Sequence, residues 1–129
     1  LVNKIIPFSA VDGPGNRTAI FLQGCNFNCL YCHNPETINI CNNCGICVNV
    51  CPIQCLTMEN GTVCWDKEKC IGCDSCLKAC KNCSSPKISH MTVEEVIRAV
   101  EKMRPFISGI TISGGECMLQ KDFVIELKK

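Results

Sequence analysis

Residues 18–35 read TAIFLQGCNFNCLYCHNP, and the interpretation of the whole chain starts from this stretch. Its first seven residues are mostly apolar and predict a short buried β-strand. Cysteines follow at positions 25, 29 and 32, in the loop directly after the strand. Functional sites of α/β proteins lie in such loops. A closed metal site takes four protein ligands, so either another cysteine supplies the fourth or one metal position is open by design.

The region after this loop contains an internal repeat of four cysteines. Each cysteine of the second run lies 29 residues after its counterpart in the first run (41 to 70, 51 to 80). Both runs read C-x2-C-x2-C-x3-C, the spacing of bacterial ferredoxins, in which the fourth cysteine ligates the other cluster. The spacing therefore predicts two [4Fe-4S] clusters, one on Cys41, Cys44, Cys47 and Cys80, the other on Cys51, Cys70, Cys73 and Cys76. Between the runs, residues 56–65 predict a β-hairpin around Asn60-Gly61.

The composition favours metal ligation over disulfides. Fifteen cysteines in 129 residues is an odd number, and the N-terminus lacks the features of a secretory signal. Zinc is the alternative metal for CxxC pairs, but two complete runs in register favour iron–sulfur clusters. A net charge of +1 gives no indication of nucleic acid, and no apolar run is long enough to span a membrane. We therefore expect a cytoplasmic protein with neither nucleic acid nor membrane as a partner.

The remaining segments predict alternating helix and strand. Thr92-Val93-Glu94-Glu95 is a capping-box pattern that opens a helix ending before Pro105. The apolar face of this helix is expected to comprise Val93, Val96, Ile97, Val100 and Met103. Residues 106–116, FISGITISGGE, predict a strand that runs into a glycine turn, with another helix from about Gln120. This βαβ order predicts a parallel sheet in one α/β domain, interrupted at residues 36–90 by a small cluster domain.

Three motifs in this order resemble the radical S-adenosylmethionine (radical SAM) activating enzymes of glycyl radical enzymes, the superfamily of the pyruvate formate-lyase activating enzyme. They are VDGPGNRTAIFLQGCNFNCLYCHNP (11–35), the twin ferredoxin runs, and TISGGE (111–116). The insert and the opening LVNKIIPFS are most like the YjjW-type activases. The resemblance spans essentially the whole chain. It implies the N-terminal part of a partial (β/α)6 TIM-type barrel with an inserted α+β dicluster ferredoxin-like domain.

The implied boundaries are 1–35 for the start of the radical SAM core, 36–90 for the insert and 91–129 for the continuation of the core. We also expect a fragment of a longer protein, because the chain lacks an initiating Met and ends within the helix-like run FVIELKK.

The resemblance also implies a cofactor site. Cys25, Cys29 and Cys32 match the CxxxCxxC loop, whose [4Fe-4S] cluster leaves its fourth iron to the amino and carboxylate groups of S-adenosylmethionine. The backbone of Ser113, Gly114, Gly115 and Glu116 matches the GGE motif that holds the methionyl amino group, where missing Cβ atoms would let a ligand approach. Tyr31 is expected beside the adenine, with a packed loop aromatic as the alternative. Asp12, Gly13, Pro14 and Gly15 match a loop thought to lie near the glycyl loop of the partner.

The implied activity uses three [4Fe-4S] clusters and S-adenosylmethionine. Reductive cleavage yields a 5′-deoxyadenosyl radical, which abstracts hydrogen from a glycine of a partner glycyl radical enzyme. A flavodoxin or ferredoxin would supply electrons through the two insert clusters. The alternatives are a radical SAM enzyme that acts on another substrate, or a non-catalytic dicluster electron-transfer module. His33, next to the last cysteine of the loop, is interpreted either as a hydrogen-bond donor near the cluster or as a surface residue, and His90 is interpreted as a surface residue. The roles of four further cysteines stay open: Cys55, Cys64, Cys83 and Cys117.

Overall fold

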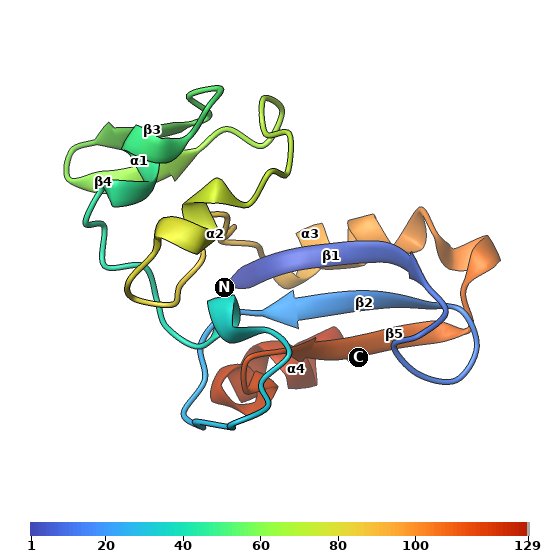
Figure 1. Cartoon of the computed structure of the whole chain (residues 1–129). Helices are drawn as coiled ribbons and strands as arrows, with labels where there is room; N and C mark the ends of the chain where they lie inside the picture. The colour runs from blue at the N-terminus through green and yellow to red at the C-terminus, as the bar shows by residue number, and fades with distance from the viewer. Residues whose placement is uncertain (129) are drawn as a thin grey trace.

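A computed structural model of the chain describes residues 1–128, so the last residue of the expected 91–129 segment lies outside the described part. A three-stranded sheet has the strand order β1-β2-β5, and a separate two-stranded hairpin pairs β3 with β4. Figure 1 shows the hairpin and two short helices, α1 and α2, standing above one end of the larger sheet. The chain thus forms an α/β body and a smaller cysteine-rich body, whose residues lie between strands β2 and β5 in the sequence.

The central strand of the sheet is β2 (Arg17–Leu22). It pairs in parallel with β5 (Gly109–Gly114), in a register that runs from Arg17 opposite Gly109 to Leu22 opposite Gly114. Ile20 and Leu22 are completely buried, because β2 has a strand on each side and helices on one face. The prediction of a buried strand here and of a parallel partner after the next helix is confirmed.

The N-terminal strand β1 (Val2–Ser9) was not predicted, and it changes the sheet from parallel to mixed. It pairs antiparallel with β2, and the register shifts twice along the strand. The alternation of apolar and polar residues is weak, Phe8 is about half exposed, and Pro7 interrupts the run of amide donors. Proline is tolerated at a sheet edge, since one side of an edge strand needs no ladder hydrogen bonds. The strand therefore depends on pairing with β2 and not on its own pattern.

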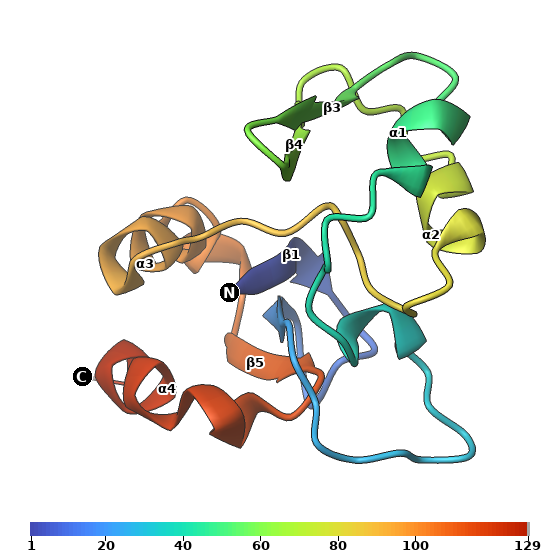
Figure 2. The same ribbon diagram turned by 90° about the vertical axis from the view of Figure 1, so that its left-hand side faces the viewer.

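Helices α3 (Val93–Glu101) and α4 (Lys121–Leu127) lie on the same side of the sheet (Figure 2). The predicted capping box is confirmed, because the Glu95 amide donates to Thr92 Oγ1 and the Thr92 amide donates to the Glu95 carboxylate. The core formed with the sheet consists of Val2, Ile20, Leu22, Val96, Val124 and Leu127. Ile97, predicted on the apolar face of α3, is 40% exposed, since the sheet and α4 cover only the Val96 side of the helix.

Short 3-10 turns complete the connections, at Pro35–Thr37, Arg104–Phe106 and Cys117–Gln120. The helix predicted from about Gln120 therefore follows one turn of 3-10 helix. None of the helices within residues 1–128 combines the length and the apolar character needed to cross a bilayer.

The cysteine-rich body repeats its structure as it repeats its sequence. Helices α1 (Ile46–Val50) and α2 (Ser75–Ala79) have equal length. Their C-cap residues, Cys51 and Cys80, have nearly identical backbone angles (φ −75°, ψ 111° and φ −77°, ψ 107°). Strands β3 (Leu56–Glu59) and β4 (Thr62–Trp65) form the predicted hairpin. Its turn residues have φ of +49° and +77°, the two positive values that a type I′ turn requires.

The two ends of this body are held together at the sheet. The Asn39 side chain donates to the Asn82 carbonyl at 2.8 Å, and the Asn82 side chain donates to the Ile40 carbonyl at 2.9 Å. Further along, Val2 and Ser89 exchange two backbone hydrogen bonds of 2.9 and 2.8 Å. The chain therefore leaves β2 and returns to the sheet at nearly the same place, since Val2 lies opposite both Leu22 and Ser89.

Candidate metal centres

Two cavities in the cysteine-rich body are each lined by four cysteines of the repeat. We call them the first cysteine cavity and the second cysteine cavity. The cysteines of the first are Cys41, Cys44, Cys47 and Cys80. Those of the second are Cys51, Cys70, Cys73 and Cys76, together with Cys55. Each cavity thus combines three cysteines of one run with the fourth of the other, which is the grouping that the ferredoxin spacing predicts.

The fourth cysteine of each run has an equivalent hydrogen-bonding neighbour four residues later. The sulfurs of Cys51 and Cys55 lie 3.4 Å apart, and Cys80 Sγ lies 3.5 Å from Ser84 Oγ. The Cys55 amide also donates to Cys51 Sγ at 3.3 Å. Burial raises the pKa of Cys55 to about 12, so its thiol stays protonated and can donate. Cys55 is therefore a neighbour of a predicted ligand, as Ser84 is at the equivalent position.

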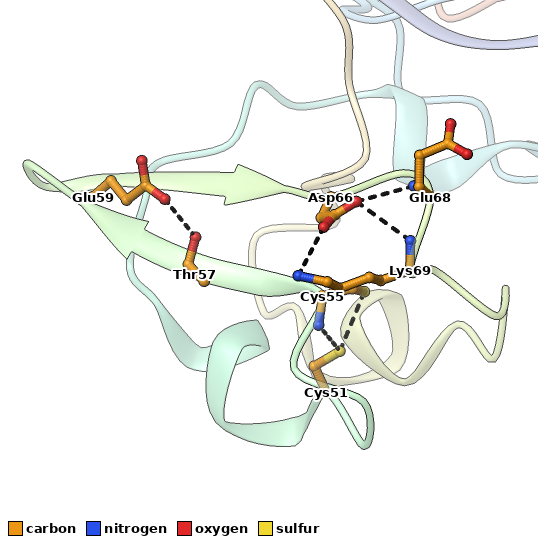
Figure 3. A network of polar contacts seen from close by, with 7 residues as sticks. All are labelled: Cys51, Cys55, Thr57, Glu59, Asp66, Glu68 and Lys69. Atoms are coloured by element: carbon orange, nitrogen blue, oxygen red, sulfur yellow. Dashed lines mark hydrogen bonds and ion pairs between the residues drawn. The ribbon is translucent and has the colours of Figure 1, made fainter.

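A polar network links the hairpin to the start of the second cysteine run (Figure 3). Its centre is Asp66, whose amide donates to the Cys55 carbonyl at 2.8 Å. The Asp66 carboxylate accepts from the amides of Glu68 and Lys69 and forms an ion pair with the Lys69 ammonium at 3.0 Å. The Lys69 side chain holds the pKa of Asp66 below its usual range. This turn leads directly into Cys70, which lines the second cysteine cavity together with Cys51.

The thiols around the two cavities differ in their tendency to ionise. Burial raises the pKa of Cys47 and of Cys76, the third cysteines of the two runs. The pKa of Cys70 is lowered, first by a hydrogen bond from the Gly72 amide and further by the Lys87 ammonium. A bound metal deprotonates its thiol ligands outright, so all of these thiols can serve as ligands.

The donor set of each cavity is four thiols, which is a ligand set of [4Fe-4S] clusters and of zinc sites. Among residues 1–128, no three histidine, cysteine, aspartate or glutamate side chains are arranged to hold one ion. In addition, Trp65 Nε1 in the wall of the second cavity is buried without a hydrogen-bond acceptor within the described part of the chain. Cluster sulfur is an acceptor that fits there.

The CxxxCxxC loop follows directly on β2. Its base is fixed, because the Gly24 and Cys25 amides donate to the Thr37 and Ile38 carbonyls at 2.8 and 2.9 Å. Beyond this base Cys29 is exposed, and Cys25 and Cys32 are half-buried. Three potential ligands therefore stand at the surface at the C-terminal end of the central strand, where a further ligand has access.

The GGE turn lies against this same strand end. The Gly115 amide donates to the Leu22 carbonyl at 3.0 Å, and the Glu116 amide donates to the Gly24 carbonyl at 2.9 Å. A Cβ at Gly114, whose φ is +107°, would collide with the Leu22 backbone, and one at Gly115 would collide with the Gly24 carbonyl. Close packing on β2 and on Gly24, just after it, is thus a structural reason for both glycines, and the ligand contact expected from the sequence stays a prediction.

Glu116 and Ser113 complete the predicted GGE motif. The Glu116 carboxylate accepts from the Met118 amide at 2.9 Å and caps the following 3-10 turn. Ser113 is half-buried in β5, opposite Phe21 of β2. The structure therefore brings the CxxxCxxC loop and the GGE turn together, although about 80 residues separate them in the sequence.

Gln23, which sequence reasoning did not single out, holds this region in place. Its side chain is 2% exposed and donates to the Glu36 and Asn39 carbonyls at 2.8 and 2.7 Å. Its oxygen accepts from the Asn3 side chain at 2.7 Å. Gln120 in turn donates to the Gln23 carbonyl at 3.1 Å. A glutamine at the end of an otherwise apolar strand was the available signal, because a buried polar side chain requires several partners.

The DGPG loop lies at the opposite end of the sheet, between β1 and β2 (Figure 1). The Ser9 hydroxyl donates to the Asp12 carboxylate at 2.6 Å, and the Thr111 hydroxyl donates to the Asp12 carbonyl at 2.6 Å. Arg17 donates to Thr111 Oγ1 at 2.6 Å and also to the Ile110 carbonyl. The structure does not bring Asp12, Gly13, Pro14 and Gly15 together with Cys25, Cys29 and Cys32.

The other residues named from the sequence lie at or near the surface. Tyr31 is 83% exposed, so the alternative of a packed loop aromatic is wrong. His33 is exposed, and His90 is exposed as expected. Cys64, Cys83 and Cys117 lie outside the lining of both cysteine cavities. Cys117 is half-buried next to the GGE turn, with its sulfur 3.9 Å from Glu116 Oε1.

Comparison with known proteins agrees with this arrangement. Residues 11–129 match the family described as 4Fe-4S single cluster domains. The chain belongs to this family. Binding of a [4Fe-4S] cluster is therefore a family property, while the family description speaks of one cluster and not of three.

Several curated proteins that are similar to this chain are activating enzymes. The isethionate sulfite-lyase activating enzyme of Nitratidesulfovibrio vulgaris is 36% identical, over 96% of this chain and 47% of the relative. The choline trimethylamine-lyase activating enzyme of Oleidesulfovibrio alaskensis is 32% identical, over 98% of this chain and 47% of the relative. The benzylsuccinate synthase activating enzyme of Thauera aromatica is 35% identical, over 98% of this chain and 44% of the relative. These relatives confirm the resemblance to activating enzymes, and the chain spans about half of their length.

Proposed function

We propose that this chain is part of an activating enzyme of a glycyl radical enzyme. The observation that carries the proposal is the meeting of the CxxxCxxC loop and the GGE turn at the C-terminal end of β2, joined by the hydrogen bond from the Glu116 amide to the Gly24 carbonyl. The activating enzymes among the relatives support the same conclusion. β2 with α3, and β5 with α4, would be the first two βα units of a partial (β/α)6 barrel, and β1 would be an antiparallel edge strand.

In this proposal, Cys25, Cys29 and Cys32 hold three irons of a [4Fe-4S] cluster, and S-adenosylmethionine binds the fourth. When bound, the cluster and S-adenosylmethionine together would supply the one-electron chemistry that produces a 5′-deoxyadenosyl radical. The chain contributes position: the bonds from Gly24 and Cys25 to Thr37 and Ile38 fix the base of the loop. The backbone of residues 113–116 adjoins this base and would hold the methionyl amino group. Tyr31, exposed on the loop, is free to contact the adenine.

We further propose that residues 36–90 are an inserted dicluster ferredoxin-like domain, between core segments 1–35 and 91–129. The two cysteine cavities support this assignment, as do the paired helices α1 and α2 and the hydrogen bonds that join Asn39 and Ile40 to Asn82. With the CxxxCxxC cluster, the chain would hold three clusters. The first cysteine cavity would take one and the second another, and electrons from a flavodoxin or ferredoxin would pass through them.

The partner in this proposal is a glycyl radical enzyme, whose glycine loses a hydrogen to the radical. Asp12, Gly13, Pro14 and Gly15 are proposed to contact its glycyl loop. Because this loop lies at the far end of the sheet from Cys25, such a contact would involve a partner segment that extends along the sheet, over about 17 Å for the six residues of β2. An electron paramagnetic resonance (EPR) doublet on a candidate glycyl radical enzyme would identify the partner, and its absence for every candidate would favour another substrate.

The experiment that tests the cofactor site is anaerobic reconstitution with an iron count and EPR of the dithionite-reduced protein, before and after addition of S-adenosylmethionine. We expect about twelve irons per chain, four for each cluster, and a change in part of the signal on addition. Cys29→Ala should abolish the change and leave about eight irons. Cys83→Ala is the matched control, because Cys83 is exposed and lies outside the lining of both cavities.

About eight irons in the unmodified protein and a spectrum indifferent to S-adenosylmethionine would refute the activase assignment and leave an electron-transfer module. The role of the insert is tested separately, by replacing Cys44 and Cys73 with alanine. Activation should then fail with flavodoxin as the donor. Undiminished activation with flavodoxin or dithionite would mean that the insert has a structural or docking role.

A further inference from the structure

The two cysteine cavities have different walls despite the sequence repeat. Asp74 lies 29 residues after Gly45, and Lys87 lies 29 residues after Met58, so these are equivalent positions of the two copies. In the second copy, Lys87 Nζ and Asp74 Oδ1 form an ion pair of 2.6 Å. In the first copy the equivalent residues also meet, since a Cβ on Gly45 would lie 2.8 Å from Met58 Cε. An uncharged contact in one copy is thus replaced by an ion pair in the other.

The charge of Lys87 reaches the second cavity more strongly than the charge of Asp74. Both residues line this cavity, but the Lys87 side chain is 17% exposed and that of Asp74 is 54% exposed. Water screens an exposed charge more than a buried one, so the ammonium dominates the local potential. The non-cysteine lining of the first cavity is uncharged and consists of Asn42, Gly45, Ile46, Ser84 and Pro86.

Trp65 adds a second difference. Its indole N–H is buried in the wall of the second cavity and has no acceptor within residues 1–128. Trp65 and the predicted ligand Cys70 line the same cavity. A buried donor without an acceptor is costly, and this cost is removed when an acceptor sulfur occupies the cavity.

We propose that the [4Fe-4S] cluster of the second cysteine cavity has the higher reduction potential of the insert pair and accepts the first electron, because Lys87 and Trp65 stabilise its reduced form. One electron from the external donor takes a cluster with four thiolates from a net charge of −2 to −3, and no bond forms or breaks. A nearby cation and an N–H donor both favour the more negative state. Hydrogen bonds to the sulfurs and local charge are established determinants of cluster potentials.

This inference rests on the proposed binding of two clusters in the insert. It is tested by an anaerobic redox titration of the reconstituted protein, followed by EPR. Lys87→Met introduces the residue found at the equivalent position of the first copy. We expect the reduction potential of the higher-potential step to fall by about 59 mV for one electron. At a fixed solution potential, this shift lowers the ratio of reduced to oxidised cluster roughly tenfold. Trp65→Phe should shift the same step in the same direction by a smaller amount.

Lys67→Met is the matched control. It removes the same charge from an exposed side chain outside the lining of both cysteine cavities, and it should leave both steps in place. Unchanged titration of both steps in Lys87→Met and Trp65→Phe would overturn the inference, as would a shift of the lower step alone. Iron counts separate this result from failure of the proposed function: loss of the insert irons in the unmodified protein refutes cluster binding, whereas a full count without the shift refutes only the assigned order.

Discussion

Replacing Gln23 with alanine is expected to lower the free energy of unfolding by about 3 kcal/mol, at about 1 kcal/mol for each of three hydrogen bonds. The side chain is 2% exposed, so water cannot replace these bonds without opening the structure. Two of the bonds, to the Glu36 and Asn39 carbonyls, hold the chain that leaves the CxxxCxxC loop. In the third bond, the side-chain oxygen of Gln23 accepts from the Asn3 side chain of β1. The substitution therefore loosens the edge strand and the base of the proposed cofactor loop together.

The assay is anaerobic urea unfolding followed by far-ultraviolet circular dichroism. Asn3→Ala provides a graded control, because it removes only one of the three bonds and should cost about 1 kcal/mol. The reasoning is refuted if Gln23→Ala costs no more than Asn3→Ala. A functional readout accompanies it: the response of the EPR signal to S-adenosylmethionine should weaken in Gln23→Ala and persist in Asn3→Ala.

Three further substitutions test other local conclusions. Gly115→Ala places a Cβ against the Gly24 carbonyl, so it should abolish the EPR response to S-adenosylmethionine while the insert keeps its iron; a retained response would contradict the packing argument. Thr92→Ala removes the side-chain cap of α3 and should cost about 1 kcal/mol in urea unfolding, and no loss would mean that the cap is unimportant. Gly61→Ala has open space around the new Cβ, so only its φ of +77° opposes the change; we expect a cost of about 1 to 2 kcal/mol, and an unchanged melting temperature would disprove the type I′ turn.

The sequence predicted the features whose signals are contained within a few neighbouring residues. The Asn60-Gly61 turn, the capping box at Thr92 and the buried strand β2 were all correct. The cysteine spacing also predicted which four cysteines surround each cavity, since a short helix carries the last cysteine of each run away from the first three. Assignment of these cysteines and of the CxxxCxxC loop as cluster ligands stays a prediction for the iron counts to test.

Tertiary structure decided what depends on contacts between distant residues. Strand β1 has a weak pattern of its own and forms by pairing with β2, so the sheet is mixed and not purely parallel. The DGPG loop is anchored by Thr111, 99 residues away, at the end of the sheet opposite the cysteine loop. Gly115 is required because the Gly24 carbonyl, just after β2, fills the place of its Cβ. Local sequence sets turns, caps and spacings through a few neighbouring torsions and hydrogen bonds, whereas strand pairing and buried polar contacts are decided only when remote segments meet.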